Sequence, residues 1–126
     1  MCGICGIYHF DPQQRVEERA VRSMAEAIRH RGPDDRGFFF DVNQGLGHLR
    51  LSIIDLSPAA HQPMTDESGR YQIIYNGEIY NYVELRQQLE SRGEAFFSQS
   101  DTEVILRLFM TEGPAAVEKL NGMFSI

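Results

Sequence analysis

The sequence predicts an α+β fold, in which helices and mostly antiparallel strands are mixed within one domain. Two periodicities support this prediction. Apolar residues alternate at every second position in several short segments, and they recur at every third or fourth position in others. The chain has 126 residues, which is the size of a single domain that can bury its own core without metal or disulfide support.

The first half of the chain is predicted to contain three strands and one helix. The helix is predicted by an apolar stripe at helical spacing, formed by Val16, Ala20, Met24, Ala27 and Ile28, and Gly32-Pro33 ends it. Asn43-Gln44-Gly45 is predicted to form the hairpin turn between the second and third strands. A segment rich in Pro, Ser and Asp is predicted to be a long loop with a function. In chain order, these elements are a strand at 2–8, a helix at 16–28, strands at 38–42 and 46–54, and the loop at 55–69.

The second half is predicted to alternate short strands with helices. Asn76-Gly77 by itself predicts a tight turn after a strand. Ser100 and Glu103 form a capping-box pattern, in which the Ser100 hydroxyl accepts from the Glu103 amide and the Glu103 side chain reaches back. The predicted elements are strands at 70–75, 95–97 and 123–126, and helices from 82 to Gly93, from 100 to Gly113-Pro114 and at 115–120.

The charge balance indicates that neither nucleic acid nor a membrane is a partner. The chain carries 18 acidic and 12 basic residues, a net charge of −6 at pH 7. Half of the basic residues lie between Arg15 and Arg36, where acidic neighbours nearly cancel them, whereas a nucleic-acid binder keeps an unopposed basic stripe. No apolar run is long enough to span a bilayer, and no secretory signal is recognised. Two cysteines in such a chain predict a reducing, cytoplasmic location.

Position 2 carries the sharpest chemical signal. The initiator Met is usually removed when the next side chain is small, and removal would give Cys2 a free α-amine. This amine has a reference pKa of about 8, so part of it is neutral near physiological pH and can act as a base beside the thiol. One residue can therefore supply both a nucleophile and its base. The simpler alternative is that a cysteine at position 2 has no function.

Cys2 and Cys5 also form a C-x-x-C pattern, which occurs in metal and redox sites. On an extended strand their Cα atoms would lie about 10 Å apart, beyond the ~7 Å limit for a disulfide. The sequence has no second cysteine pair and no histidine pair at zinc spacing. A metal or redox protein is therefore the less favoured alternative, and Cys5 is expected to be a buried small residue.

Five motifs occur in order and together resemble one family. They are Met1-Cys2-Gly3-Ile4, Arg29-His30-Arg31-Gly32-Pro33-Asp34, His48-Leu49-Arg50-Leu51-Ser52-Ile53, Asn76-Gly77-Glu78-Ile79-Tyr80-Asn81 and Ser100-Asp101-Thr102-Glu103-Val104-Ile105. The chain resembles, over its whole length, the N-terminal glutaminase domain of glutamine-hydrolysing asparagine synthetases, a class II glutamine amidotransferase. The resemblance implies the αββα sandwich of N-terminal-nucleophile hydrolases.

The resemblance implies that three residues carry the catalytic step. Cys2 would attack the side-chain amide carbon of glutamine, with its own α-amine handling the proton. Asn76 matches the oxyanion residue, whose side-chain amide would hold the developing negative oxygen together with the backbone N–H of Gly77. A glycine at position 77 lets the backbone approach the substrate closely.

The resemblance also implies which side chains bind glutamine. Arg50 matches the residue that binds the α-carboxylate, and strand parity places it on the face of His48 and Ser52. Glu78 and Asp101 match the carboxylates that take the α-ammonium group. Considered without the resemblance, Glu78 would be a solvated charge, and Asp101 would stabilise a helix dipole.

Backbone groups of Leu51, Ile53 and Ile54 lie at family positions that contact glutamine, while their side chains are predicted to lie in or near the core. His30 and Arg31 also lie near the family's site. A basic helix end is favoured by the helix dipole, so we expect structural roles for these two residues.

The implied reaction converts glutamine and water to glutamate and ammonia through a thioester on Cys2. In the parent enzyme, the ammonia would pass to a synthetase domain that uses ATP and magnesium, and no cofactor is expected in residues 1–126. Family members continue past this point with further strands. We therefore expect residues 1–126 to be an incomplete, truncated amidotransferase domain whose open strand edge favours a homo-oligomer. The alternative is a catalytically silent fragment or interaction module.

Overall fold

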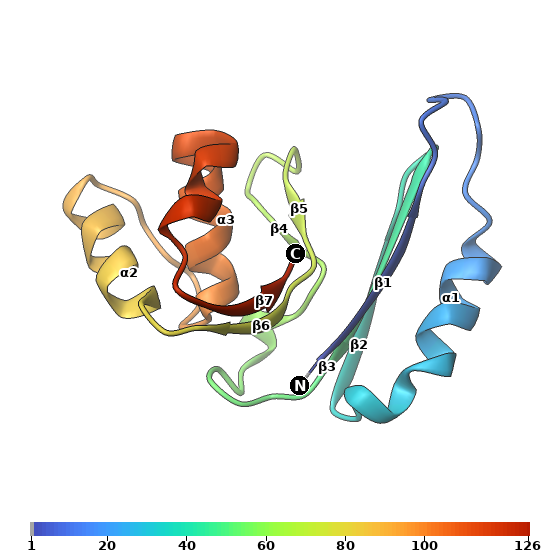
Figure 1. Ribbon diagram of the computed structural model, residues 1–126, viewed down its shortest axis with the longest axis horizontal. Coiled ribbons are helices and arrows are strands. Elements are labelled where there is room, and N and C mark those ends of the chain that lie inside the picture. Colours follow the sequence, from blue (N-terminus) through green and yellow to red (C-terminus); the bar gives the residue numbers. More distant parts are fainter. Residues whose placement is uncertain (1) are drawn as a thin grey trace.

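Four layers, in the order helix, sheet, sheet, helix, make up the structure, which is a computed structural model that describes residues 2–126 (Figure 1). Helix α1 covers the outer face of the first sheet, and helices α2 and α3 lie on the far side of the second layer of strands (Figure 1). This order agrees with the predicted αββα sandwich. No helix in the described part of the chain is long and apolar enough to cross a membrane.

The first sheet has three antiparallel strands in the order β1–β3–β2. The central strand is buried at His48, Leu49 and Arg50, because the sheet lies between α1 and the second layer of strands. An apolar leucine can face a helix, but a buried histidine and arginine need polar partners across the layer boundary. The strands are β1, Gly3–Tyr8, β2, Asp35–Phe40, and β3, Gln44–Arg50.

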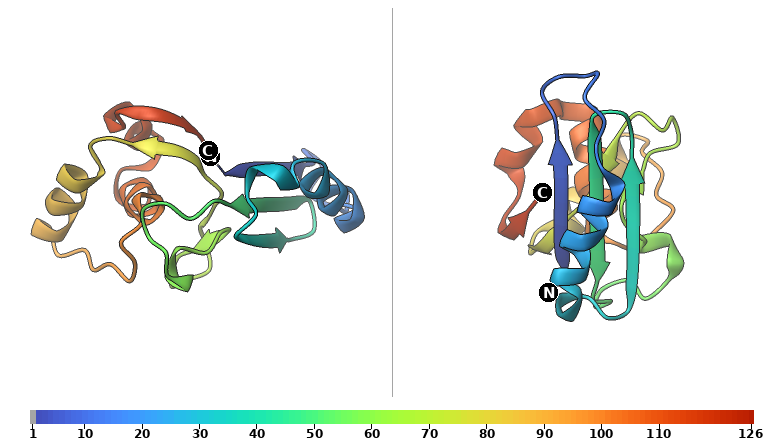
Figure 2. Two further views of the ribbon diagram at one scale, coloured as in Figure 1. Left: turned by 90° about the horizontal axis from the view of Figure 1, so that it is seen from below. Right: turned by 90° about the vertical axis from the view of Figure 1, so that its right-hand side faces the viewer.

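Helix α1, Glu18–Ala27, packs across this sheet (Figure 2). Its buried residues are Val21 and Ala25, whereas Met24, which was predicted to belong to the apolar stripe, is 39% exposed. The predicted helix at 16–28 therefore exists, but it begins at Glu18, and a different face of it packs against the sheet. The small side chains of the actual stripe let the helix approach the strands closely.

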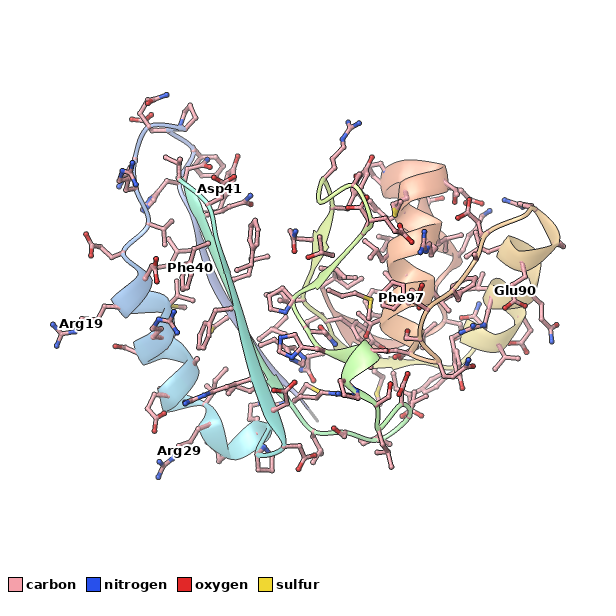
Figure 3. The ribbon with its side chains drawn as sticks, turned by 180° about the vertical axis from the view of Figure 1, so that it is seen from behind. Arg19, Arg29, Phe40, Asp41, Glu90 and Phe97 are labelled. Atoms are coloured by element: carbon pink, nitrogen blue, oxygen red, sulfur yellow. The ribbon has the colours of Figure 1, made fainter. Side chains whose placement is uncertain are left out.

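Opposite charges balance on the solvent side of α1, as the sequence predicted. Arg22 lies 3.4 Å from Glu18, and Arg29 lies 3.0 Å from Glu26. Figure 3 shows the side chains of Arg19 and Arg29 pointing away from the sheet. Exposed pairs of this kind contribute little to stability, about 0.3–0.5 kcal/mol each, and they leave no unopposed basic stripe along this helix.

The second layer contains two short antiparallel sheets, backed by helices. Three short 3₁₀ helices connect the main elements of the described chain. The strand pairs are β4, Met64–Thr65, with β5, Gln72–Ile73, and β6, Asn76–Ile79, with β7, Gly122–Ser125. The helices are α2, Tyr82–Ser91, α3, Asp101–Glu112, η1, Arg29–Arg31, η2, Pro58–Ala60, and η3, Gly113–Lys119.

The main apolar core lies between the second layer and the helices behind it. Ile79 of β6, Leu89 of α2 and Val104 of α3 are at most 1% exposed. Residues 101–108 of α3 are buried without interruption, polar ones included, so neighbours surround this helix. Polar groups at its N-terminal end therefore face other protein groups rather than water.

Several predicted boundaries in the first 100 residues are wrong. β2 begins at Asp35 rather than at position 38, and β3 ends at Arg50 rather than at position 54. The turn between them lies at 41–43, since Gln44 is already paired in β3. Residues 95–97 form no strand. Apolar alternation continued past the point where the chain leaves the sheet, and alternation alone cannot locate that point.

Ser100 caps α3, as predicted, but with a different donor. Its hydroxyl accepts from the Thr102 N–H at 3.1 Å, not from Glu103. The Glu103 carboxylate is fully buried and does not reach back to Ser100. It accepts from the Phe97 N–H at 3.0 Å, and from the Ser98 N–H at 2.7 Å and hydroxyl at 2.6 Å. These bonds hold the segment before α3 in an irregular conformation, which explains why no strand forms there.

Asn76-Gly77 is not a turn. The two residues begin β6 and pair with Ser125 and Phe124 of β7. The dipeptide has the local signature of a turn, but pairing with a strand nearly 50 residues away overrides it. At Gly77 an added Cβ would lie 2.3 Å from the carbonyl oxygen of Met123, so the glycine is required by the approach of β7.

We expect Gly77→Ala to destabilise the fold by about 1–3 kcal/mol, because β7 has to move away from the new methyl group. Gly3→Ala is the matched control. Its methyl group would meet mainly side-chain atoms, the nearest being Ile28 Cδ1 at 3.0 Å, and these can adjust. Thermal or urea unfolding measures both variants. Equal stability of Gly77→Ala and the wild-type protein would contradict this description of the β6–β7 pair.

Candidate active site

A cavity of about 110 Å³ lies where the end of β3, the strands β6 and β7, and the start of α3 meet. Pockets for drug-sized ligands typically have volumes of about 300–1,000 Å³, so this one suits a small molecule. A larger hollow of about 1030 Å³ between α1 and β2 contains none of the predicted site residues.

Eight of the nine predicted site residues line the small cavity. The ninth, Asn76, is half-buried and is the direct neighbour of the lining residue Gly77. Four of the five sequence motifs thus contribute to one place. The eight are Cys2, Arg50, Leu51, Ile53, Ile54, Gly77, Glu78 and Asp101.

Three contacts hold Cys2 at the cavity. Two join its sulfur to the backbone of Leu51, and one joins its carbonyl oxygen to the side chain of Arg31. The Leu51 N–H points at Sγ with a distance of 3.4 Å, and the thiol lies 3.6 Å from the Leu51 carbonyl oxygen. Arg31 donates from Nε to the Cys2 carbonyl at 3.0 Å. Arg31 acts here by holding the backbone of Cys2, which fits the structural role expected for it.

Cys5 does not share this environment. Its sulfur lies 3.8 Å from the carbonyl oxygen of Val21, on the α1 side of the sheet. Burial raises the pKa of the Cys5 thiol, which makes the thiolate scarce. Both cysteines are free thiols, and no group of three or more potential ligands in residues 2–126 could hold a metal ion. The C-x-x-C pattern therefore does not form a paired site in the described structure.

Among residues 2–126, Arg50 is the only cationic residue that lines the cavity. The residue is 7% exposed, and its guanidinium donates from Nη1 to the Ser57 carbonyl at 3.0 Å and from Nη2 to the Asp55 carbonyl. A guanidinium has five N–H donors, so donors remain for an anionic ligand. The loop that follows β3 thus fixes the position of this charge.

The loop also corrects one prediction. Leu51, Ile53 and Ile54 were predicted to lie in or near the core as a continuation of β3, but Ile53 is 69% exposed and Ile54 is 39% exposed. Because β3 ends at Arg50, strand parity no longer applies to these residues. All three residues line the cavity, and the backbone N–H and carbonyl of Leu51 contact the Cys2 sulfur.

Asp101 is a buried carboxylate at the start of α3. Its Oδ2 accepts from the Tyr75 hydroxyl at 2.8 Å and from the Ile79 N–H at 3.4 Å. Burial raises the pKa of Asp101, and the hydrogen bonds from these two donors oppose the rise. Asp101 is therefore more than a partner of the helix dipole, because it connects α3 to the strands in front of it.

Tyr75, Gln62 and Thr102 also line the cavity, but sequence reasoning did not single them out. Gln62 accepts from the Tyr75 N–H at 2.7 Å and donates to the Thr102 hydroxyl at 3.1 Å. The one signal in the sequence was Tyr75 itself, because a buried tyrosine needs a hydrogen-bond partner for its hydroxyl. Nothing in the sequence indicated that the partner is Asp101.

His48 connects the first sheet to the segment between β5 and β6. Its ring is 1% exposed, and its Nε2–H donates to the Tyr75 carbonyl at 3.2 Å. Burial lowers the pKa of His48 to about 4, and the nearby Arg50 charge acts in the same direction. The ring is therefore neutral at physiological pH and serves as a hydrogen-bond donor, not as an acid or base.

Asn76 and Glu78 occupy the side of the cavity formed by β6. The Oδ1 atom of Asn76 is buried and accepts no hydrogen bond from any described residue. Such an atom is uncommon in a native structure and often marks a functional position. Glu78 is exposed and lines the cavity, so its carboxylate can meet a ligand without first breaking an internal pair.

We expect Tyr75→Phe to raise the pKa of Asp101 further, because the lost hydroxyl stabilises the ionised carboxylate. The folded state already holds this proton more tightly than the unfolded chain, so Asp101 makes stability fall as pH rises from the ordinary Asp pKa through the raised one. The variant extends this fall to higher pH. Carboxyl ¹³C NMR titration together with unfolding at several pH values measures both effects. Tyr71→Phe is the control, and an unchanged Asp101 titration in Tyr75→Phe would contradict the prediction.

The four layers have the αββα order of the predicted N-terminal-nucleophile hydrolase fold (Figure 1). A structure of glutamine phosphoribosylpyrophosphate amidotransferase from Bacillus subtilis, complexed with ADP and GMP, superposes with a TM-score of 0.79. The superposition covers 96% of this chain and 33% of that one, at 20% identity. This similarity confirms the predicted fold.

The chain belongs to the glutamine amidotransferase domain family, whose pattern it matches over residues 1–126. It is 45% identical to asparagine synthetase [glutamine-hydrolyzing] 1 of Bacillus subtilis over 99% of its length. It is 43% identical to putative asparagine synthetase [glutamine-hydrolyzing] 2 of Methanocaldococcus jannaschii and 36% identical to asparagine synthetase B of Escherichia coli, each over 99% of its length. The chain spans 20%, 27% and 22% of these three relatives.

Proposed function

We propose that this domain hydrolyses L-glutamine to L-glutamate and ammonia through a thioester on Cys2. One observation carries the proposal: a single small cavity holds the Cys2 sulfur together with a guanidinium and carboxylates. A thiol supplies the nucleophile, and opposite charges that line the same cavity suit the two charged ends of an α-amino acid. Membership of the amidotransferase family supports the same reaction.

The proposed reaction begins when the Cys2 sulfur attacks the amide carbon and the α-amine, freed by removal of Met1, takes the thiol proton. The amide oxygen becomes negative, and Asn76 and the Gly77 N–H donate to it. The carbon–nitrogen bond then breaks, and the proton on the α-amine passes to the leaving nitrogen, which departs as ammonia. Water attacks the remaining γ-glutamyl thioester, with the α-amine again acting as base, and releases glutamate and the free thiol.

Substrate binding is proposed to use opposite sides of the cavity. Arg50 binds the α-carboxylate, and Asp101 and Glu78 bind the α-ammonium group. Backbone groups of the loop after β3, at Leu51 and Ile53 among others, complete the contacts with the amino acid. This division explains why a buried arginine and a buried aspartate are both placed at one small cavity.

In the parent protein, the ammonia is proposed to serve asparagine synthesis in the cytoplasm. This proposal rests on the names of the relatives, which are glutamine-hydrolysing asparagine synthetases. ATP and magnesium would then belong to a synthetase domain rather than to residues 1–126. A homo-oligomer is also proposed, because β7 pairs with β6 on one edge and with no other strand in the described residues.

Ammonia release is the direct test. Protein that intact-mass measurement shows to begin at Cys2 is incubated with L-glutamine, and ammonia is measured by a coupled assay. We expect turnover with L-glutamine and much less with D-glutamine, which presents its α-groups to Arg50 and Asp101 in the wrong arrangement. Ammonia release no faster than from buffer alone would favour the silent interaction module and contradict the proposal.

A further inference from the structure

The side chain of Asp55 holds the loop over residues 51–57 at two points. Its Oδ1 accepts from the Ser57 N–H at 2.8 Å, which closes the loop on itself. Its Oδ2 accepts from the Gln99 N–H at 2.8 Å, which ties the loop to a segment 44 residues away. Its backbone carbonyl accepts from Nη2 of Arg50. Asp55 thus contacts both the loop and two elements on either side of the cavity.

The two elements that Asp55 joins carry the opposite charges of the cavity. Arg50 donates only to carbonyls of this loop, at Asp55 and Ser57. Gln99 stands two residues before Asp101, and Ser100 between them is the N-cap of α3. A shift of the loop relative to Gln99 would therefore change the distance between the Arg50 guanidinium and the Asp101 carboxylate.

We propose that Asp55 is a positioning residue that sets the spacing between the group that binds the substrate α-carboxylate and the group that binds its α-ammonium. This inference rests on the proposed function for the identity of the ligand, a free L-α-amino acid. Asp55 also lines the cavity, but both of its carboxylate oxygens already accept hydrogen bonds, so it acts through Arg50 and through the start of α3. Hydrogen bonds to Ser57 and Gln99 lower the pKa of Asp55, so it stays an acceptor at physiological pH.

Asp34, which precedes β2, offers a matched control because it bonds to the same loop. Its Oδ2 accepts from the Ser52 N–H at 2.8 Å, but it makes no bond to the α3 side and does not line the Cys2 cavity. Asp34→Asn and Asp55→Asn each remove one carboxylate from a hydrogen bond to the loop. A general loosening of the loop would affect both variants equally, whereas a change in spacing between the two charges would affect only Asp55→Asn.

The test separates binding from turnover. Calorimetry measures L-glutamine binding to the Cys2→Ser protein, alone and combined with each Asn substitution. We expect Asp55→Asn to raise the Kd about tenfold, the loss of one charge-assisted hydrogen bond, and Asp34→Asn to change it less than about twofold. In protein that keeps Cys2, KM should rise by a similar factor with kcat nearly unchanged.

Equal Kd values for the two Asn variants would overturn the inference, and so would a fall in kcat at constant KM for Asp55→Asn. Failure of the proposed function looks different. A protein that binds glutamine in an Asp55-dependent way but releases no ammonia would retain the positioning role and lose the hydrolase. A Cys2→Ser protein that binds no glutamine would reject both.

Discussion

Cys2→Ser should reduce ammonia release from glutamine by about 10⁴-fold or more, to the background rate. The serine hydroxyl has nearly the size of the thiol and can keep the contacts with Leu51, so the cavity should remain intact. What is lost is the nucleophile, because a hydroxyl is almost never ionised at neutral pH without a strong base. Glutamine binding should persist, which calorimetry can measure in parallel with the ammonia assay.

Cys5→Ser is the control for this result, since it removes the other thiol of the chain. Cys5 contacts the carbonyl of Val21 on the far side of the sheet, and we expect full activity with a small loss of stability. If Cys5→Ser lost activity and Cys2→Ser kept it, the nucleophile would have been assigned to the wrong cysteine. Loss in both variants would favour a role for the C-x-x-C pair.

Asn76→Ala should lower kcat by about 10²–10³-fold, the usual effect of removing one oxyanion donor. KM should change little, because the negative oxygen exists only after attack. The buried Oδ1 atom of Asn76 accepts no hydrogen bond from residues 2–126, so the substitution breaks no internal pair that would confuse the result. Steady-state kinetics at several glutamine concentrations separates the two parameters.

Asn81→Ala is the matched control at the other end of β6. Its side chain donates to the Lys119 carbonyl at 2.9 Å and accepts from the Asn121 N–H at 2.9 Å, so it has a structural role. This variant should lose stability and keep its kcat. An equal fall in kcat in both variants would indicate that Asn76 supports the fold rather than the oxyanion.

The grouping of the candidate site residues could be predicted from sequence better than the bounds of the elements that carry them. Arg50, Gly77 and Asp101 line one cavity with Cys2, as the motifs indicated. Each motif names residue types with a particular chemical ability, and that ability does not depend on where a strand begins or ends. Strand ends depend on which segments pair, and Asn76-Gly77 shows the difficulty, because its partner strand lies at 122–125.

The supporting contacts were beyond prediction for a related reason. Tyr75 and Asp101 form a hydrogen bond between positions 26 residues apart, and Asp55 bonds to Gln99 across 44 residues. A tyrosine or aspartate in a sequence indicates that a partner is needed when the residue is buried, but not which partner. Whether a residue is buried depends on how the layers of the fold pack together, and local sequence patterns do not encode that packing.

The most direct test of the central claim is the site of covalent modification by a chloroketone analogue of glutamine, in which the electrophilic carbon replaces the side-chain amide. Peptide mass spectrometry on protein that begins at Cys2 locates the adduct. We predict one adduct per chain, on Cys2, whose formation excess L-glutamine slows, and no adduct on Cys5. Modification of Cys5 at the same rate, or labelling of Cys2 that glutamine does not slow, would contradict the assignment of this cavity as a glutamine site with Cys2 as its nucleophile.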